Sequence, residues 1–381
     1  MDTKLFINPN GKLLKPTKED YKVFIPNKLP LKIEYTDNLI KKIELANNNL
    51  GLLSGLINNL PNPDLFLKPY LQKEAVISSR IEGTKSSLSD VLKSDFESSK
   101  VNDDLKEVLN YIKAMEFGLS EIKEKKISLE LMLNLNRILL DGVRGFSTEN
   151  GKIRSVQNWI GNQYSDLYTS IYNPPNPEVT RELLNNLVEY INTDDKSFLV
   201  KSAIIHYQFE AIHPFVDGNG RVGRLLIILY LCKSNLLDKP ILYLSEYFEK
   251  DKNKYYFNLL NVSMKSDING WVEYFLDGVI EQSKKTNIKV KKLLDYRAKT
   301  RTILKEKEVN MKVMRIFDYL FSNPYIDVIK GKEILETSNY MTSKRVILKL
   351  VEIGILRVLK EKKERKLNIY IADEINKIIS E

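Results

Sequence analysis

The stretch "HPFVDGNGRVGR", residues 213–224, collects side chains that could act on a phosphate-rich substrate. His213, with an ordinary pKa of about 6.5, could take a proton from a hydroxyl near neutral pH. Asp217 is a hard oxygen ligand of the kind that Mg²⁺ prefers. Arg221 and Arg224 lie three residues apart, so on a helix they occupy neighbouring positions and could bind phosphate oxygens bidentately. Together these residues predict nucleotide transfer from a triphosphate.

The glycines of the same stretch indicate where the phosphates would bind. One helical pattern ends near Ile212 and the next begins near Arg221, which places the glycines at a helix N-terminus. The first N–H groups there lack intrahelical partners, and the helix dipole is positive. We expect Gly218 and Gly220 to turn successive N–H groups inward, forming a nest for a phosphate.

The whole string resembles the signature of the Fic family (filamentation induced by cAMP), H-P-F-x-[DE]-G-N-G-R-x-x-R, at every signature position. The resemblance extends through "HYQFEAIHPF", "IRSVQNWIG" and a proline loop, over at least residues 65–280. It implies transfer of AMP from ATP, with Mg²⁺, to a Ser, Thr or Tyr hydroxyl of a target protein. His213 is then the implied general base, and Asp217 the implied Mg²⁺ ligand. The implied nucleotide-binding residues are Asp217, Gly218, Asn219, Gly220, Arg221 and Arg224.

Three finer features follow from the same resemblance. Gly220 is typical of the AMP-transferring form, because the related Doc toxins, which phosphorylate, typically have lysine at that position. Ile160 and Gly161 resemble the flap edge that holds a target segment by strand addition. The segment "YYFNLLNVS" resembles the adenine-side helix, so Tyr255 is a candidate for contacting the base, although Ser263 stands where some members have asparagine. The alternative for Tyr255 is aromatic packing in the bundle.

Residues 78–83, "SSRIEG", resemble the family's inhibitory motif, [ST]-x-x-x-E-[GN], which comprises Ser78, Glu82 and Gly83 here. The resemblance implies that Glu82 pairs with Arg224. An arginine so occupied cannot hold the γ-phosphate, and a misplacement of about 1 Å can reduce a rate about a hundredfold. The plain alternative is a helical i,i+4 pair of Ser78 and Glu82. Some members also use this glutamate to remove AMP, so an enzyme that reverses the modification is an open alternative.

The composition predicts a mainly α protein of two or three domains, because 381 residues include only 16 glycines and 13 prolines. We expect an N-terminal arm and inhibitory helix region (1–100), a Fic-type catalytic core (101–300) and a C-terminal domain (305–381). After Gly151 a short alternating pattern predicts a small β-hairpin flap. The expected helices lie at about 37–60, 63–81, 103–121, 128–141, 178–193, 196–212, 221–234, 245–264 and 268–300.

After Lys305, three helical segments and an alternating tail predict a winged helix-turn-helix domain. This domain raises an alternative function, a DNA-binding regulator in which the Fic core serves as a nucleotide sensor. Lys344, Arg345 and Lys349 would then contact DNA, together with the turn at 360–366. Winged helices also serve protein contacts, so a homodimer is a further possibility.

Charge and cysteine content restrict the remaining classes. Most of the net charge of +9 comes from residues 284–312, where eleven Lys/Arg face three Asp/Glu, a pattern typical of a solvated helix. The polar N-terminus and short apolar runs predict a cytoplasmic protein without a secretory signal or membrane contact. Cys232 reads as a small core residue in a reducing compartment. With two histidines and one cysteine we expect no zinc site, and we expect His206 to be buried and hydrogen-bonded.

Overall fold

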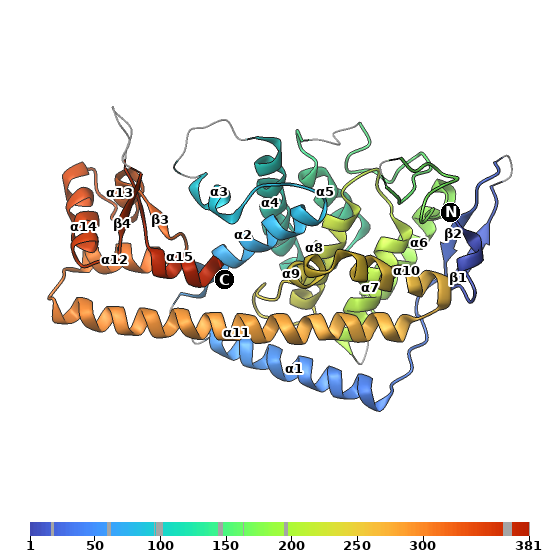
Figure 1. Cartoon of the computed structure of the whole chain (residues 1–381), viewed down its shortest axis with the longest axis horizontal. Helices are drawn as coiled ribbons and strands as arrows, with labels where there is room; N and C mark the ends of the chain where they lie inside the picture. Colours follow the sequence, from blue (N-terminus) through green and yellow to red (C-terminus); the bar gives the residue numbers. More distant parts are fainter. Residues whose placement is uncertain are drawn as a thin grey trace.

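The protein is an elongated, mainly helical molecule, as expected, and one long helix runs along most of it (Figure 1). The computed structural model describes residues 1–16, 19–58, 62–94, 96, 102–143, 148–162, 164–193, 197–360 and 368–380. Within these ranges, every helix is too short or too polar to span a bilayer.

Eleven helices precede residue 307 in the described part of the chain. They are α1 (Asp37–Asn58), α2 (Pro63–Ile81), α3 (Leu88–Lys93), α4 (Asp103–Glu124), α5 (Leu129–Leu139), α6 (Pro177–Ile191), α7 (Phe198–Ile212), α8 (Asn219–Lys233), α9 (Ser245–Lys250), α10 (Lys252–Lys265) and α11 (Ile268–Glu306). Side-chain caps fix several starts, because Asn102, Ser128 and Asp267 accept hydrogen bonds from first-turn amides of α4, α5 and α11.

Helices α7 and α8 form the centre of the bundle. Nearly all their residues are buried, as expected for helices that are apolar on every face. Helix α6 and α11 pack on α7, while α4 and α5 pack on α8. The loop between α7 and α8 therefore has both ends fixed in the core, which gives the site a rigid base.

Two helix boundaries differ from the sequence-based expectation. The helix expected at 245–264 is broken at Asp251, whose side chain caps α10 by accepting from the Lys254 amide at 2.9 Å. Helix α3 was not expected, and it begins with a capping box formed by Ser87 and Asp90. In both places a short polar side chain forms a hydrogen bond to the backbone and so sets where a helix begins. The periodicity of apolar residues does not reveal such hydrogen bonds.

The N-terminal arm forms a small hairpin that supports the flap. Strands β1 (Gly11–Leu14) and β2 (Val23–Pro26) pair antiparallel, after the short 3₁₀ turn η1 (Thr3–Leu5). In the described part of the flap, the expected hairpin is represented by one antiparallel bridge, between Ile160 and Tyr172. Phe24 packs on Tyr172 with ring centroids 5.8 Å apart, so the arm covers one side of the flap.

The C-terminal part contains the elements expected of a winged helix. These are α12 (Met311–Tyr319), β3 (Tyr325–Ile326), α13 (Val328–Ile334), α14 (Tyr340–Glu352), β4 (Arg357–Lys360), β5 (Ile369–Ile371) and, not expected from the sequence, α15 (Asp373–Ser380). The strands form an antiparallel sheet in the order β3-β5-β4. Of the turn expected at 360–366, residues 361–366 lie outside the described residues.

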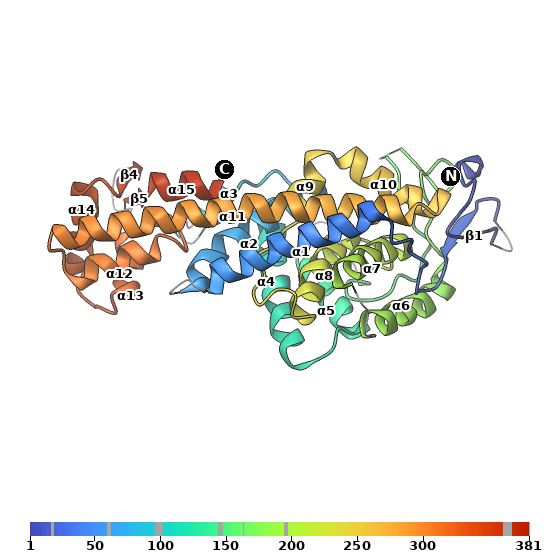
Figure 2. The ribbon, with the colours of Figure 1, turned by 90° about the horizontal axis from the view of Figure 1, so that it is seen from below.

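The C-terminal part packs on the helix that carries the inhibitory motif. Helix α15 contacts both α2 and α11 (Figure 2). The Phe66 and Phe321 rings lie 5.1 Å apart, and Asn323 Nδ2 donates to the Leu92 carbonyl at 3.0 Å. Segments at the two ends of the sequence therefore share one core.

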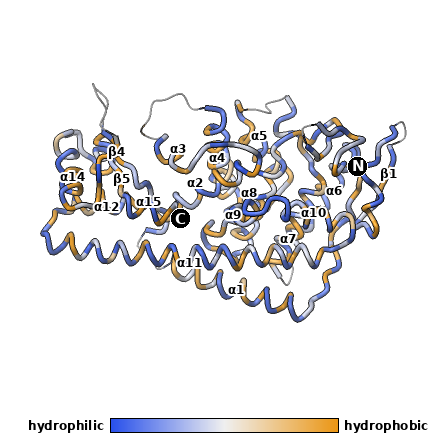
Figure 3. The backbone as a smooth tube through the Cα atoms, in the orientation of Figure 1, coloured by the Kyte–Doolittle hydropathy of each residue, from blue (hydrophilic) through white to orange (hydrophobic). Residues whose placement is uncertain are grey.

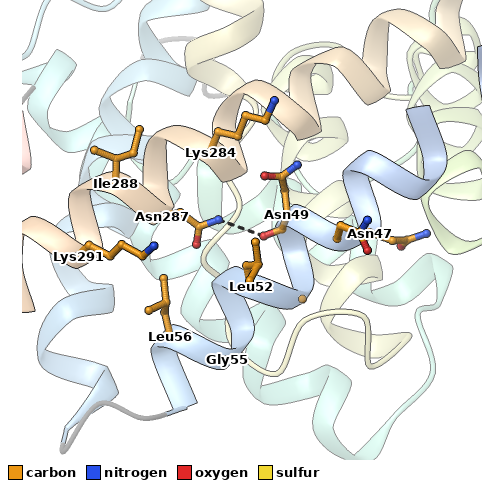
Figure 4. A pocket seen from close by; sticks show the side chains of 11 residues that line it. Asn47, Asn49, Leu52, Gly55, Leu56, Lys284, Asn287, Ile288 and Lys291 are labelled. Carbon is orange, nitrogen blue, oxygen red and sulfur yellow. Dashed lines mark hydrogen bonds between the residues drawn. The ribbon is translucent and has the colours of Figure 1, made fainter. Parts of the chain in front are cut away.

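Helix α1 lies alongside α11 (Figures 1 and 2). Polar residues cover much of α11, with apolar residues recurring between them (Figure 3). Asn287 Nδ2 donates to the Asn49 carbonyl at 3.2 Å beside a groove of about 980 Å³ (Figure 4). The groove is lined by Asn47, Asn48, Asn49, Gly51, Leu52, Gly55, Leu56, Lys284, Asn287, Ile288 and Lys291. Because α1 packs on α11 along its length, the boundary expected at residue 100 does not separate two independent cores.

Candidate active site

The loop at 213–218 is held by hydrogen bonds from the start of α8 and from α5. The Asn219 side chain accepts from the Phe215 amide at 2.8 Å and donates to the Phe215 carbonyl at 2.9 Å. Asn136 Nδ2, on α5, donates to the Asp217 carbonyl at 2.8 Å. Since Asn219 is 3% exposed, its side chain fixes the loop, and only its backbone N–H can take part in the nest expected from the sequence.

Arg154 fixes the loop from the flap side, a role that the sequence analysis missed. Its Nε donates to the His213 carbonyl at 2.9 Å, and its other nitrogens donate to the carbonyls of Val156 and Pro175. Arg154 is 1% exposed, and this burial lowers its pKa to about 10. The residue lies within "IRSVQNWIG", a segment that takes part in the family resemblance. Its contact with residue 213 is visible only in the three-dimensional structure.

His213 lies at the C-terminus of α7, in a left-handed backbone conformation with φ of 49°. The residue is half-buried, and its Nδ1 atom is buried. Burial, followed by the charge of Arg154, lowers its pKa to about 4. The imidazole is therefore neutral at pH 7, and Nε2 is the nitrogen left to meet a substrate hydroxyl.

The N-terminus of α8 provides the expected anion-binding position, but the two glycines do different things. Gly218 is the N-cap with φ of 80°, the conformation expected of it. Gly220 has no positive φ and belongs to the helix, which corrects the expectation that it turns the backbone. A Cβ atom at Gly220 would lie 2.3 Å from Glu82 Oε1 and 2.9 Å from Arg224 Nη1, so this glycine is needed for close approach.

Arg224 and the segment 78–83 meet as expected. Arg224 Nη2 donates to Glu82 Oε1 at 2.6 Å, and Arg224 Nε donates to Ser78 Oγ at 2.8 Å. Burial would raise the pKa of the Glu82 carboxyl, but the charge and hydrogen bond of Arg224 outweigh it and lower the pKa. Gly83 ends α2 with φ of 102°. The Glu82 carboxylate thus lies against the N-terminus of α8.

Arg221 occupies a different environment from its expected one. Its Nη1 donates to Glu107 Oε2 of α4 at 2.9 Å, and the residue is 2% exposed. Its Nη2 lies 3.8 Å from Asp217 Oδ1. Arg221 therefore joins α8 to α4, and the phosphate contact expected of it from the sequence stays a prediction.

Asp217 fits a Mg²⁺ site that the nucleotide itself would complete. Its side chain is 47% exposed, and Oδ1 accepts from the Gly218 amide at 2.6 Å. Among the described residues, no cluster of three or more His, Cys, Asp or Glu could hold a metal alone. Mg²⁺ in nucleotide sites typically uses one or two carboxylates, waters and the phosphates, and this donor set matches that chemistry.

Tyr255 is placed in the core and does not face the site. It is 1% exposed, and its hydroxyl lies 2.7 Å from His206 Nε2, which confirms the buried, hydrogen-bonded role expected for His206. Ser263 is also buried, and its Oγ lies 3.1 Å from the Tyr207 hydroxyl. The neighbouring Tyr256 is 45% exposed, and after burial the Glu82 charge is the main cause that raises its pKa. Tyr256 is thus the more exposed of the two neighbouring tyrosines.

The flap residues are arranged differently from expectation. The Ile160 amide donates to the Tyr172 carbonyl at 2.8 Å, and the Ile160 carbonyl accepts from the Tyr172 amide at 3.1 Å. Both backbone groups of Ile160 are therefore used within the flap. In an antiparallel pair the groups of adjacent residues point the other way, so Trp159 and Gly161 present the outer edge.

Glu210 and Glu74 are buried carboxyl groups that the sequence analysis did not identify. Burial raises the pKa of Glu210 to about 8 and that of Glu74 to about 7. Glu210 Oε1 would lie 2.3 Å from a Cβ atom at Gly223, so it packs directly on α8. Glu210 belongs to "HYQFEAIHPF". An acidic residue in an otherwise apolar helix could have indicated a buried carboxyl group there.

Comparison with known protein families agrees with this geometry. Residues 40–120 match the Fic/DOC family N-terminal model, and residues 126–231 match the Fic/DOC family model. The segment from residue 40 to residue 231 belongs to the Fic family. A Fic family protein from Desulfovibrio desulfuricans has a similar fold, with a TM-score of 0.58 and 18% identity over 90% of this chain and 98% of that one. A Fic domain containing signaling protein from Bacteroides thetaiotaomicron has a TM-score of 0.54 and 21% identity, over 66% of this chain and 97% of its own.

Curated relatives are similar over the Fic region. A probable protein adenylyltransferase of Aquifex aeolicus is 31% identical over 180 residues, which are 45% of this chain and 51% of the relative. A protein adenylyltransferase of Caenorhabditis elegans is 29% identical over 175 residues, 44% of this chain and 31% of the relative. The chain thus spans about half the length of the first relative and about a third of the second.

Proposed function

We propose that this Fic-family chain is a protein adenylyltransferase that transfers AMP from ATP to a Ser, Thr or Tyr hydroxyl of a target protein. The observation that carries the proposal is the meeting of His213, the N-terminus of α8 and Arg224 around one loop. A neutral base for the hydroxyl and a positive site for phosphates then lie side by side. The relatives from Aquifex aeolicus and Caenorhabditis elegans, which are named as protein adenylyltransferases, support the same reaction.

In the proposed reaction, the hydroxyl oxygen of the target forms a bond to the α-phosphorus of ATP. The bond from that phosphorus to the oxygen bridging to the β-phosphate breaks, and pyrophosphate leaves. The hydroxyl proton passes to Nε2 of His213. Asp217 would hold Mg²⁺ with the phosphates, where the ion would offset their negative charge. We propose that Arg224 binds the γ-phosphate and that Tyr256, rather than Tyr255, faces the base.

We also propose that Glu82 keeps the enzyme weakly active at rest. Its carboxylate lies 2.6 Å from Arg224 Nη2 and close to the backbone at Gly220, which supports a direct competition with the phosphates. A bound ATP would then be displaced at its α-phosphate, where a misplacement of about 1 Å can reduce the rate about a hundredfold. Trp159 and Gly161 would present the target segment by strand addition.

The test uses ATP labelled at the α-phosphate, incubated with Mg²⁺ and the purified chain. We expect Glu82→Gly to label itself, or a protein of a lysate, at least tenfold more than wild type. The double variant Glu82→Gly/His213→Ala should show no label. Equal labelling of the single and the double variant would exclude His213 as the base, and no label in either would contradict the transferase.

The other roles expected from the sequence have less support. On α14, Lys349 is paired with Glu352 at 2.7 Å, and the alternative of a DNA-binding regulator using Lys344, Arg345 and Lys349 stays a prediction. Removal of AMP with Glu82 as a participant stays an alternative for the same site. A cytoplasmic location fits the free thiol of Cys232, which lies at the edge of the core.

A further inference from the structure

A small polar cavity lies between α2, α9 and α11. Its volume is about 30 Å³, enough for one or two groups the size of a water molecule. Tyr70, Lys73, Glu74 and Ile77 lie on one face of α2, at i, i+3, i+4 and i+7. The complete lining is Tyr70, Lys73, Glu74, Ile77, Tyr243, Glu246, Gln282, Lys285, Thr286 and Lys289.

Three buried polar atoms of this lining lack a hydrogen-bond partner among the described residues. They are the Tyr70 hydroxyl, Gln282 Nε2 and Glu74 Oε2. The three residues are 8%, 4% and 2% exposed. A buried donor without a partner costs about 1–3 kcal/mol, so such atoms gathered around one cavity indicate a site for a ligand. Tyr70 and Gln282 contribute donors.

The charges around the cavity favour an anion. Lys73 lies 3.1 Å from Glu246, and Lys285 lies 3.5 Å from the same carboxylate. Lys289 forms no ion pair with any described residue, and its pKa falls to about 8 because of burial and then the charge of Lys73. Burial raises the pKa of Glu74 to about 7, so this carboxyl is partly neutral and can donate from Oε2. Lys285 is also paired with Glu281 at 2.9 Å, so Lys289 is the lysine of this lining whose charge no ion pair with a described carboxylate offsets.

We propose that this cavity binds a small inorganic anion between the ammonium groups of Lys73 and Lys289. The Tyr70 hydroxyl and the Gln282 amide donate to the same anion. The volume admits chloride, or one phosphoryl group of inorganic phosphate entering from the lysine side. Both ligands present the same chemistry, a compact negative charge that accepts several hydrogen bonds.

An anion at this position ties α2 to α11 and thus stabilises the helix that leads to Ser78 and Glu82. Tyr70 and Lys73 come from α2, while Gln282 and Lys289 come from α11. The site is separate from the nucleotide site, and its existence does not depend on the proposed transferase activity. Its readout is the stability of the protein and the protection of α2 amides.

The test measures the melting temperature of the full chain at constant ionic strength, while sodium gluconate is replaced by sodium chloride or by sodium phosphate. We expect the wild type to gain several degrees with at least one of the two anions. The arm that responds identifies the ligand. Lys289→Met should weaken the apparent affinity about tenfold or more, as should Tyr70→Phe, which removes only the hydroxyl. Hydrogen exchange of the amides of residues 70–77 should slow with the same anion.

Lys291→Met is the matched control, because it removes the same charge from an exposed position two residues further along α11. We expect this variant to respond to the anion as the wild type does. If neither anion stabilises the wild type, the cavity holds only water and the proposal is wrong. An unchanged response in both Lys289→Met and Tyr70→Phe would likewise assign any stabilisation to another part of the surface.

Discussion

His213 and Glu210 lie one helical turn apart on α7, and burial favours the neutral form of each. The pKa of His213 falls to about 4, whereas that of Glu210 rises to about 8. The loop therefore holds an uncharged base, and Glu82 provides the negative charge that balances Arg224. The charge state of each group at the site thus depends on whether the core buries it.

The lowered pKa of His213 predicts an unusual pH profile. Because the imidazole stays neutral until the pH falls towards 4, kcat/KM of Glu82→Gly for self-labelling should change little between pH 7.5 and 5.5. A histidine with an ordinary pKa would lose about tenfold over that range. The measurement is the initial rate of labelling across the range. A tenfold fall with a midpoint near 6.5 would contradict the account of a buried base.

The Arg221–Glu107 pair predicts a large effect on stability. Arg221 is 2% exposed, so Glu107→Ala would leave a buried charge without its partner and should lower the free energy of unfolding by about 3–5 kcal/mol. Glu352→Ala breaks the exposed Lys349–Glu352 pair and should cost less than about 1 kcal/mol. Urea denaturation of the two variants compares them. Similar small losses in both would show that Arg221 is hydrated.

Among the elements, the flap is linked to the loop at 213–218 by a buried guanidinium, that of Arg154. Arg154 donates to the carbonyls of His213, Val156 and Pro175, which belong to the loop, the flap and the segment before α6. The planar guanidinium of arginine has several donors in fixed directions and suits binding to three carbonyls. The ammonium group of lysine does not. A substitution at Arg154 should therefore disturb both the flap and the loop at 213–218.

Arg154→Lys in the Glu82→Gly background tests this coupling. It keeps the charge but loses the fork of donors, and we expect labelling to fall about tenfold to a hundredfold, with a lower melting temperature. Tyr164, which is 86% exposed, offers a control, since Tyr164→Phe keeps a large ring outside this network. Labelling by Arg154→Lys equal to that of its parent would show that the loop holds its geometry without Arg154.

The parts of the site that could be read from the sequence are those fixed by neighbours along the chain. The end of α2 at Gly83 and the start of α8 at Gly218 follow from local backbone demands, since both glycines have a positive φ. The roles of Arg154 and Glu107 could not be read, because their partners lie 59 and 114 residues away. The burial of Tyr255 and the exposure of Tyr256 could not be read either, because the sequence does not show which of two adjacent aromatic residues of a helix faces the core.

For the whole molecule, one continuous core extends from the N-terminal helices to α15. Leu39 of α1, Phe66 of α2 and Ile379 of α15 belong to the same apolar cluster. A second cluster joins Leu92 of α3 to Tyr325 and the C-terminal sheet. The helix that carries the inhibitory motif is therefore held between the Fic core and the C-terminal part.

This shared core predicts a single calorimetric unfolding transition for residues 1–381. Phe66 is 2% exposed, so Phe66→Ala should lower stability by about 3–5 kcal/mol and shift the whole transition. Tyr340→Ala, at a 40% exposed position of α14, should shift it little. Two separate transitions in the wild type would show that the C-terminal part unfolds independently of α2.

The most direct test of the central claim is the intact mass of Glu82→Gly after incubation with ATP and Mg²⁺. The account predicts an increase by one AMP group on a hydroxyl side chain, and no increase when His213→Ala is added. An increase by a phosphate group, or an unchanged mass with ATP bound, would contradict adenylyl transfer by this site.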